Sequence, residues 1–309
     1  MPELPEVTTT VNGLRRVLKG LTISDVWTDL SKKDPIKQFK NTIKDEKFFI
    51  KFRKSVSNKK ILGVERRAKN ILINIFGSNT ILIHLKMTGH LIYGKYIYNK
   101  KENKWAPDKN ERVELHDPYN RFIHVVFSLS NGKSIVMCDA RKFGKVTMSP
   151  TNLINDSVHL KDIGPEPLDK NFTFLKFKKR ILTKPNKNIK TVLMNQCVIA
   201  GIGNIYSDEM LWLASINPES KPKYIPDKNL ILLYKSMKKV LSKGIKFGGD
   251  SMSDYRDIDG KRGNFQNHHN VYQKKGEFCT VNNCNGVIIK KVIDGRSSHF
   301  CNNHQKIFK

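Results

Sequence analysis

The sequence has 309 residues, of which 39% are hydrophobic and 27% charged, so it is long enough for about two packed domains. It has no apolar run long enough to cross a membrane and no secretory signal, which argues against membrane and disulfide-framed secreted proteins. Its 56 Lys and Arg residues against 28 Asp and Glu residues give a net charge of +28, so we expect an intracellular protein with a nucleic-acid partner.

Charge alone leaves two alternatives open. Part of the excess can reflect the Lys-, Asn- and Ile-rich composition that an A·T-rich genome encodes. Positive charge also does not distinguish DNA from RNA or from an anionic membrane surface. The nature of the partner therefore has to come from motifs.

The first half of the chain predicts one helix followed by strands. Apolar residues recur at helical spacing over 5–19. Short apolar or alternating runs then predict strands, and the Asn131-Gly132 pair between the last two is a strong hairpin signal. This pattern predicts an antiparallel sandwich or barrel. The strands are expected at 70–76, 80–85, 91–98, 122–130 and 134–138, with a polar loop insertion at 99–120.

The second half has a different character. A turn-rich stretch follows residue 150 and predicts a linker. Helical patterns come after it, the last ending at Gly248-Gly249, and a polar segment without a helix or strand pattern follows. The chain therefore predicts a helical C-terminal half with a small cysteine-containing module at its end. The helices are expected at about 172–183, 188–198, 204–214 and 228–246.

The cysteine module has the spacing Cys279-x4-Cys284-x16-Cys301-x2-His304. Two close pairs of sulfur and nitrogen ligands can close a tetrahedron around Zn²⁺ and leave no open catalytic position. The sequence therefore predicts one structural zinc ion. His299 is a second candidate for the fourth ligand.

The segment "AGIGNIYSDEMLW" (200–212) predicts a phosphate-binding turn. Gly201 and Gly203 permit a tight turn, and Asn204 is expected to cap the helix that follows. Free N–H groups at a helix start bind phosphate. Alone this motif is typical of any helix corner, but with the charge and the zinc module it favours a clamp on a DNA backbone.

Seven segments in order resemble the formamidopyrimidine-DNA glycosylase family. Together they span essentially the whole chain. They are "MPELPEV" at the start, "RRAKN" at 66–70, "HLKMTG" at 84–89, "DARKFG" at 139–144, "GPEPL" at 164–168, "NQCVIAGIGNIYSDE" at 195–209 and "GRSSHFC" at 295–301.

The resemblance implies an α+β protein. Its fold would be an antiparallel β-sandwich with an N-terminal helix, then a helix–two-turn–helix domain with a β-hairpin zinc finger. Expected boundaries are 1–150 for the catalytic sandwich, 151–170 for a linker, 171–265 for the helical domain with a lesion-capping loop, and 266–309 for the zinc finger. A monomer bound to double-stranded DNA with oxidised purines or abasic sites is expected.

The resemblance also implies a chemistry. The family excises 8-oxoguanine and formamidopyrimidines and then nicks the strand by β,δ-elimination. After removal of Met1, Pro2 would be the amine that forms a Schiff base and Glu3 the general acid. Lys69 would contact the lesion's phosphates and assist proton transfer. Arg296 would grip phosphate and aid δ-elimination.

Other residues match the family's DNA contacts. The resemblance implies that the space left by an extruded base is filled by Met87, Arg141 and Phe143, and that Arg141 faces the orphaned cytosine. Further contacts are expected from residues distributed over both halves, where backbone contacts position the enzyme without reading sequence. These residues are Glu6, His84, His124, Lys190 and Asn204.

The chain departs from the family pattern at several positions. The fourth zinc ligand is His304 instead of Cys, and the first ligand pair is spaced by four residues instead of two. Lys142 replaces the second Arg of the wedge motif, and Phe122 replaces one His of a pair. Two alternative functions stay open on the same scaffold: an endonuclease VIII-type glycosylase for oxidised pyrimidines, or a non-catalytic zinc protein that binds damaged DNA.

Overall fold

The computed structural model describes all 309 residues, apart from the side chain of Gln38. It divides into two compact units. The first comprises Met1–Lys161 with Gly248–Asn264, and the second comprises Asp162–Phe247 with Phe265–Lys309. The predicted domain boundaries therefore differ in one main respect: 248–264, expected in the helical domain, belongs with the N-terminal unit.

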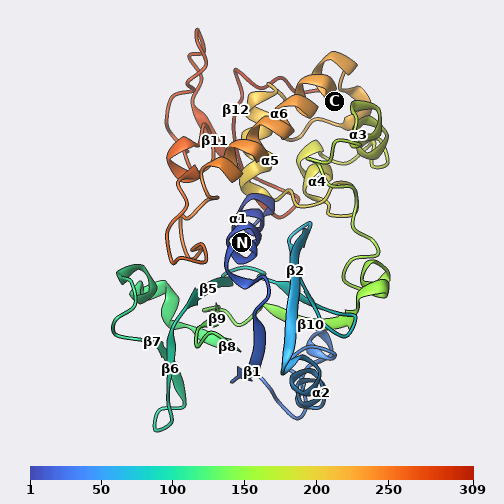
Figure 1. Cartoon of the computed structure of the whole chain (residues 1–309). Helices are drawn as coiled ribbons and strands as arrows, with labels where there is room; N and C mark the ends of the chain where they lie inside the picture. Colours follow the sequence, from blue (N-terminus) through green and yellow to red (C-terminus); the bar gives the residue numbers. More distant parts are fainter. The chain divides into compact units, whose positions relative to one another are not determined.

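The first unit is built on an eight-stranded antiparallel sheet with the order β10-β4-β3-β2-β1-β8-β9-β5 (Figure 1). Only two residue pairs join β1 to β2, whereas the other neighbours pair over most of their length. Apolar side chains of both four-stranded halves share one core, so the expected sandwich is confirmed. The strands are β1 (Thr22–Thr28), β2 (Lys59–Arg67), β3 (Asn70–Ile75), β4 (Asn79–His84), β5 (His90–Gly94), β8 (Ile123–Leu129), β9 (Ser134–Cys138) and β10 (Lys145–Pro150).

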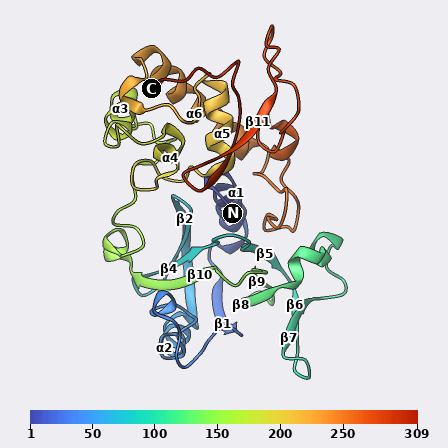
Figure 2. The same ribbon diagram turned by 180° about the vertical axis from the view of Figure 1, so that it is seen from behind.

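Two helices contribute to this core. Helix α1 (Leu4–Leu18) buries Val7, Val11 and Leu14, which recur at helical spacing, and α2 (Glu46–Val56) buries Phe52 and Val56. A separate hairpin, β6 (Tyr96–Asn99) and β7 (Lys104–Pro107), extends from the sheet in both views (Figures 1 and 2). Its first strand overlaps the strand expected at 91–98, and β7 lies in the stretch expected to be a polar loop insertion.

The segment 248–264 packs against α1. A Cβ atom at Gly13 would lie 2.6 Å from Cγ1 of Ile258, so glycine is what allows Ile258 to approach the helix. Ile258 joins the core of this unit, and the Ile258 carbonyl accepts a hydrogen bond from Tyr93 N. The segment therefore belongs to the packing of the sandwich, although it has no helix or strand.

The second unit contains four helices and a β-hairpin. The apolar residues of the helices form one core, which includes Leu230, Leu233, Met237 and Leu241 of α6. The C-terminal segment returns to this unit, where Lys221 N donates to the Phe308 carbonyl. The elements are α3 (Phe174–Ile181), α4 (Ile189–Met194), α5 (Asn204–Leu213), α6 (Asp227–Lys246), β11 (Ile288–Ile293) and β12 (Arg296–Cys301). Across the described residues, no helix combines the length and apolar character needed for a membrane crossing.

Candidate active site

The chain start is fixed by a reciprocal cap on α1. Glu3 is the N-cap residue, and its side chain accepts from the backbone of Glu6. The Glu6 carboxylate accepts in turn from Glu3 N through Oε2, at 2.7 Å. Pro2 and Glu3 are both buried, whereas Met1 is 46% exposed. Two of the predicted catalytic residues are thereby held at one rigid helix end.

Glu6 also connects this helix end to the distant segment 248–264. Its Oε1 accepts from Asp250 N at 2.7 Å, and its backbone carbonyl accepts from the Tyr255 hydroxyl at 3.0 Å. Burial raises the pKa of the Tyr255 phenol, so the group keeps the proton that it donates. Glu6 is 2% exposed, and its carboxylate positions protein groups. Its predicted contact with DNA stays a prediction.

Lys69 lies in the turn between β2 and β3 and is 4% exposed. The turn includes Ala68 at a φ of 52°, whose carbonyl accepts from Arg66 Nη1 at 2.9 Å. His84 pairs with Asn70 across β3 and β4. Burial, followed by the charges of Lys86, Lys69 and Lys145, lowers the pKa of His84 to about 3. This corner of the sandwich is therefore electropositive, which suits an anionic ligand.

The side chain of Asp139 organises the predicted wedge residues. Asp139 accepts from the Thr88 hydroxyl, from Arg141 N at 3.3 Å and from Gly144 N at 2.7 Å. One carboxylate thus joins the loop before β5 to the loop after β9. The three predicted wedge residues lie on these loops: Met87 is 39% exposed, Phe143 is 42% exposed, and the Arg141 guanidinium lies over the Phe143 ring at 4.7 Å.

His124, a predicted DNA contact, has an internal partner in this structure. It is 8% exposed, and its Nδ1 lies 2.9 Å from both carboxylate oxygens of Asp29. Because an ionised carboxylate only accepts, Nδ1 is the donor. The predicted contact stays a prediction, and the structure gives this histidine an internal partner.

Lys190 is buried in the second unit, at 1% exposure. Its Nζ lies 2.7 Å from Asp208 Oδ1 and donates to the Ser297 carbonyl at 2.9 Å. The ion pair joins α4 to α5 and β12. Asp208 Oδ2 accepts from His299 N, so the same carboxylate also holds the alternative zinc ligand. Lys190 therefore has a connecting role here, and its predicted phosphate contact stays a prediction.

Two predicted site residues of the second unit follow directly after turns: Asn204 after the turn with Gly201 and Gly203, and Arg296 after the turn of the β11–β12 hairpin. The predicted cap was wrong by one position: Gly203 is the N-cap of α5 and Asn204 is its first helical residue. Oδ1 of Asn204 is buried and has no hydrogen-bond partner among the described residues. Arg296 is exposed at the start of β12, directly after an Asp294-Gly295 turn with two positive φ angles.

That turn is anchored to α4 and the residue before it. Asp294 Oδ2 accepts from Thr191 Oγ1 at 2.6 Å and from Asn188 Nδ2 at 3.0 Å. These bonds lower the pKa of the Asp294 carboxyl. The position of Arg296 is therefore tied to the helical part of its unit.

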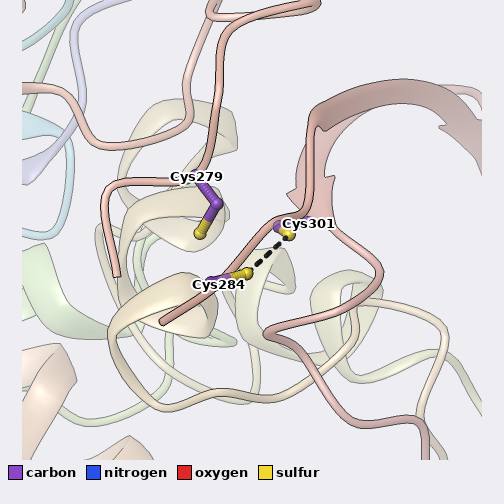
Figure 3. Close-up of side chains that lie close together, drawn as sticks. All are labelled: Cys279, Cys284 and Cys301. Atoms are coloured by element: carbon purple, nitrogen blue, oxygen red, sulfur yellow. Dashed lines mark hydrogen bonds between the residues drawn. The ribbon is translucent and has the colours of Figure 1, made fainter. Parts of the chain in front are cut away.

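The three module cysteines lie together (Figure 3). Their sulfur atoms all lie within 4.8 Å of one another, and those of Cys284 and Cys301 are 3.7 Å apart. This group could hold a metal ion, and its soft thiolate donors suit zinc. His304 is not in the group: its Nε2 lies 2.8 Å from the Trp212 carbonyl. His299 is held by Asp208 instead.

Three functional partners were missed by sequence reasoning. Asp139 and Asp208 lie inside quoted motifs but were given no role. Glu209 was also missed: it accepts the backbone N–H groups of 270–272 at 2.9 to 3.0 Å. The available signal was a carboxylate inside a family motif, but Thr88, Lys190 and 270–272, which these carboxylates bind, are distant in sequence.

Comparisons with known proteins match both halves of the chain to domains of the same family. Residues 1–146 match the family described as "Formamidopyrimidine-DNA glycosylase N-terminal domain", and residues 163–256 match "Formamidopyrimidine-DNA glycosylase H2TH domain". Formamidopyrimidine-DNA glycosylase of Pelotomaculum thermopropionicum is 36% identical over 99% of this chain and 100% of its own length. The Bacillus subtilis enzyme of that name is 32% identical over 97% of this chain and 98% of its own.

Solved structures give the same result. A Lactococcus lactis Fpg mutant in complex with DNA containing Fapy-dG has a TM-score of 0.81 and 29% identity, covering 99% of this chain and 100% of that one. The Lactococcus lactis Fpg in complex with DNA containing an abasic site has a TM-score of 0.80, again at 29% identity, covering 98% and 99%. The chain therefore belongs to the formamidopyrimidine-DNA glycosylase family.

Proposed function

We propose that this protein is a bifunctional DNA glycosylase and abasic-site lyase that removes oxidised purines, including 8-oxoguanine and formamidopyrimidines, from duplex DNA. One observation carries the proposal: Pro2 and Glu3 lie together at a capped helix start, held by Glu6. Relatives named formamidopyrimidine-DNA glycosylase support it, as do the complexes of a Lactococcus lactis relative with Fapy-dG and abasic-site DNA.

The first step requires a free amine at Pro2, which removal of Met1 supplies. An α-amino group has a pKa of about 7.7–8.0, so roughly a tenth is unprotonated at neutral pH. The Pro2 nitrogen uses its lone pair to bond C1′ of the lesion nucleotide, the glycosidic bond breaks, and the base leaves with that electron pair and a proton. The Pro2 nitrogen then loses its own N–H proton.

Ring opening follows in the same sugar. The nitrogen lone pair forms a C=N bond to C1′ while the C1′–O4′ bond breaks, and Glu3 protonates O4′ as a general acid. The resulting iminium has no N–H to lose and stays cationic. It therefore accepts the electron pair that the C2′–H bond leaves when C2′ loses its proton. This elimination expels the 3′ phosphate, and a second elimination expels the 5′ phosphate.

Charged residues assist these steps in the proposal. Lys69 contacts the lesion's phosphates and assists proton transfer, in keeping with its position in a lysine cluster whose charges add to burial in lowering the pKa of His84. Arg296 holds phosphate from the anchored hairpin turn. The exposed Met87 and Phe143 fill the space left by the extruded base, while Arg141 pairs with the orphaned cytosine.

We further propose that Cys279, Cys284 and Cys301 hold one structural zinc ion with His304 as fourth ligand. The Trp212 carbonyl can only accept, so its bond to Nε2 leaves Nδ1 as the unprotonated nitrogen. Metal-binding histidines commonly donate their other nitrogen to a backbone carbonyl in this way. A metal-to-protein ratio near one in protein purified without chelator is expected, and a ratio near zero would contradict the zinc site.

Borohydride trapping tests the catalytic proposal. Protein incubated with an 8-oxoguanine:cytosine duplex and borohydride should form a covalent protein–DNA adduct, because reduction fixes the iminium. A form with one extra residue before Pro2 is the control, since it converts the secondary amine into an amide and should give no adduct. Intact-mass analysis that finds Met1 on the active protein would exclude Pro2 as nucleophile.

The same assay separates the alternatives. Adduct formation only with a thymine glycol duplex would favour the oxidised-pyrimidine branch. Binding to damaged duplex without any adduct would show a non-catalytic DNA-binding protein. A trapped adduct with the 8-oxoguanine duplex is the expected outcome.

A further inference from the structure

A cavity lies within the sandwich unit, and no residue of the chain start lines it. Its volume is about 490 Å³, which is within the range of small-molecule pockets. Its wall comes from β1, β7, β8 and the loops beside them, and the residues used below are Trp27, Asp29, Lys104, Trp105, Arg121 and His124. Lys142, which lies between two predicted wedge residues, also lines it.

Two residues of this wall carry buried polar atoms without partners among the described residues. They are Nε2 of His124 and Nε1 of Trp105. Since Nδ1 of His124 donates to Asp29, Nε2 of the neutral ring is an acceptor. The indole nitrogen of Trp105 is a donor. Both atoms are sealed from solvent, and a position that excludes water also excludes a ligand atom, so a ligand in the cavity contacts the rings and cations of the wall and not these two atoms.

The remaining wall combines aromatic rings with cations. Trp27 and Trp105 lie with their ring centroids 6.2 Å apart at an interplanar angle of 64°, so they are not stacked on each other. Lys104, Arg121 and Lys142 supply positive charge, whereas Asp29, the acidic residue of the wall, faces His124. Aromatic faces combined with cations are typical of sites for unpaired nucleotides.

We propose that this cavity binds one unpaired nucleotide, with the base against Trp27 and Trp105 and the phosphate near Lys104 and Arg121. The nucleotide comes either from solution or from a strand of bound DNA, which share this chemistry. Neither source requires glycosylase chemistry, so the site goes beyond the proposed function.

A titration distinguishes the parts of the ligand. Binding of dGMP is followed by tryptophan fluorescence in the full-length protein, with deoxyguanosine and ribose 5-phosphate as partial ligands. We expect dGMP to bind at least tenfold more tightly than either fragment, because only dGMP engages both rings and cations. The Lys104→Ala variant should lose at least tenfold in dGMP affinity.

The Lys101→Ala variant is the matched control. Lys101 lies on the same β6–β7 hairpin, is exposed and does not line the cavity, so its loss should leave dGMP binding unchanged. Trp105→Ala removes the aromatic ring from the cavity wall and should weaken dGMP binding severalfold. Equal behaviour of Lys104→Ala and Lys101→Ala towards dGMP would exclude the free-nucleotide source.

A second arm tests the DNA source. Affinity is compared for an abasic-site duplex with and without one unpaired nucleotide in the opposite strand. If the site takes a strand nucleotide, the extra nucleotide should tighten binding by the wild type but not by Lys104→Ala. Absence of a Lys104-dependent effect in both arms would overturn the inference. The Lys104→Ala variant should incise the fully paired abasic duplex as the wild type does. A loss of this incision would bear on the proposed function and not on the nucleotide site.

Discussion

Asp139 links two loops that the chain separates by about fifty residues. It accepts hydrogen bonds from Thr88 Oγ1 and from the backbone of Arg141 and Gly144. Replacing it by alanine leaves these donors without their charged acceptor. Because hydrogen bonds to charged groups contribute more than neutral ones, the geometry of Met87 and Phe143 depends strongly on this single side chain.

The Asp139→Ala variant should lose about 3 kcal/mol of unfolding free energy, because several donors lose a charged acceptor. Thr88→Val removes the Thr88 hydroxyl alone and should cost about 1 kcal/mol. Urea denaturation of both variants measures the difference. Abasic-site duplex affinity should fall in Asp139→Ala as well. Equal stability losses in the two variants would contradict the central role of the carboxylate.

His84 makes stability depend on pH. Its pKa is about 3 in the folded protein, so the folded state stays neutral while the unfolded chain binds a proton near pH 6.5. The unfolded state therefore holds more protons between these values, and stability falls as the pH decreases from about 6.5 towards 3. Between pH 7 and pH 5 this linkage costs about 2 kcal/mol.

The His84→Asn variant is the control for this effect. An Asn side chain can offer an oxygen to Lys86 N, which now donates to His84 Nδ1 at 3.0 Å, and it does not titrate. We expect the wild type to lose about 2 kcal/mol more than the variant between pH 7 and pH 5. Chemical denaturation at the two pH values measures it, and parallel losses would contradict the assignment.

At the level of elements, two neighbouring glycines at the start of 248–264 are not equivalent. Gly248 and Gly249 have φ angles of 72° and 85°. A Cβ at Gly249 would lie 2.8 Å from Cγ of Glu6, whereas at Gly248 the nearest atom is 3.6 Å away. The positive φ disfavours alanine at both positions. At Gly249 an alanine Cβ would in addition clash with the Glu6 side chain.

Gly248→Ala should therefore cost about 1 kcal/mol from backbone strain. Gly249→Ala should cost about 3 kcal/mol, because displacement of Glu6 is added. Only Gly249→Ala should also slow adduct formation by Pro2, since Glu6 caps the helix that holds it. Thermal denaturation and borohydride trapping of the pair measure both effects, and a larger loss in Gly248→Ala would contradict the contact.

The sequence predicted the elements with the strongest periodicity. Strands β3, β4, β8 and β9 and helix α6 were recognised to within a few residues, because their apolar patterns are not interrupted. The strand expected at 91–98 is divided into β5 and β6, and β7 was missed. Helix α2 was missed, since "EKFFIKFRKSV" places Lys and Arg among its apolar residues. Strands β1, β2 and β10 were missed as well, because charged and polar residues interrupt their patterns.

The site was predicted in part. Motifs identified the helix start, the wedge loops and the three cysteines, because each is local in sequence. The internal partners of Lys190 and His124 were not predictable, since Asp208 and Asp29 lie 18 and 95 residues away along the chain. The position of 248–264 was missed for the same reason. Long-range contacts leave no local pattern.

For the whole molecule, the charge of +28 predicts strong salt dependence of DNA binding. A protein that makes six or more phosphate contacts loses on the order of 10³ in affinity between 50 and 200 mM salt. We expect at least this loss for undamaged duplex, measured by fluorescence anisotropy across that range. A nearly flat dependence would mean that the basic surface does not contact phosphates.

The packing of 248–264 on α1 also has a consequence for synthesis. Thr10 and Tyr255, which meet in this contact, are 245 residues apart in the chain. At ribosomal rates of about 5–20 residues per second, the helix that carries Pro2 waits roughly 12–50 s for its partner to be translated. The nascent chain thus displays its N-terminal half before the helix that carries Pro2 is braced by 248–264. Completion of the first unit waits for a segment that is translated well after the rest of that unit.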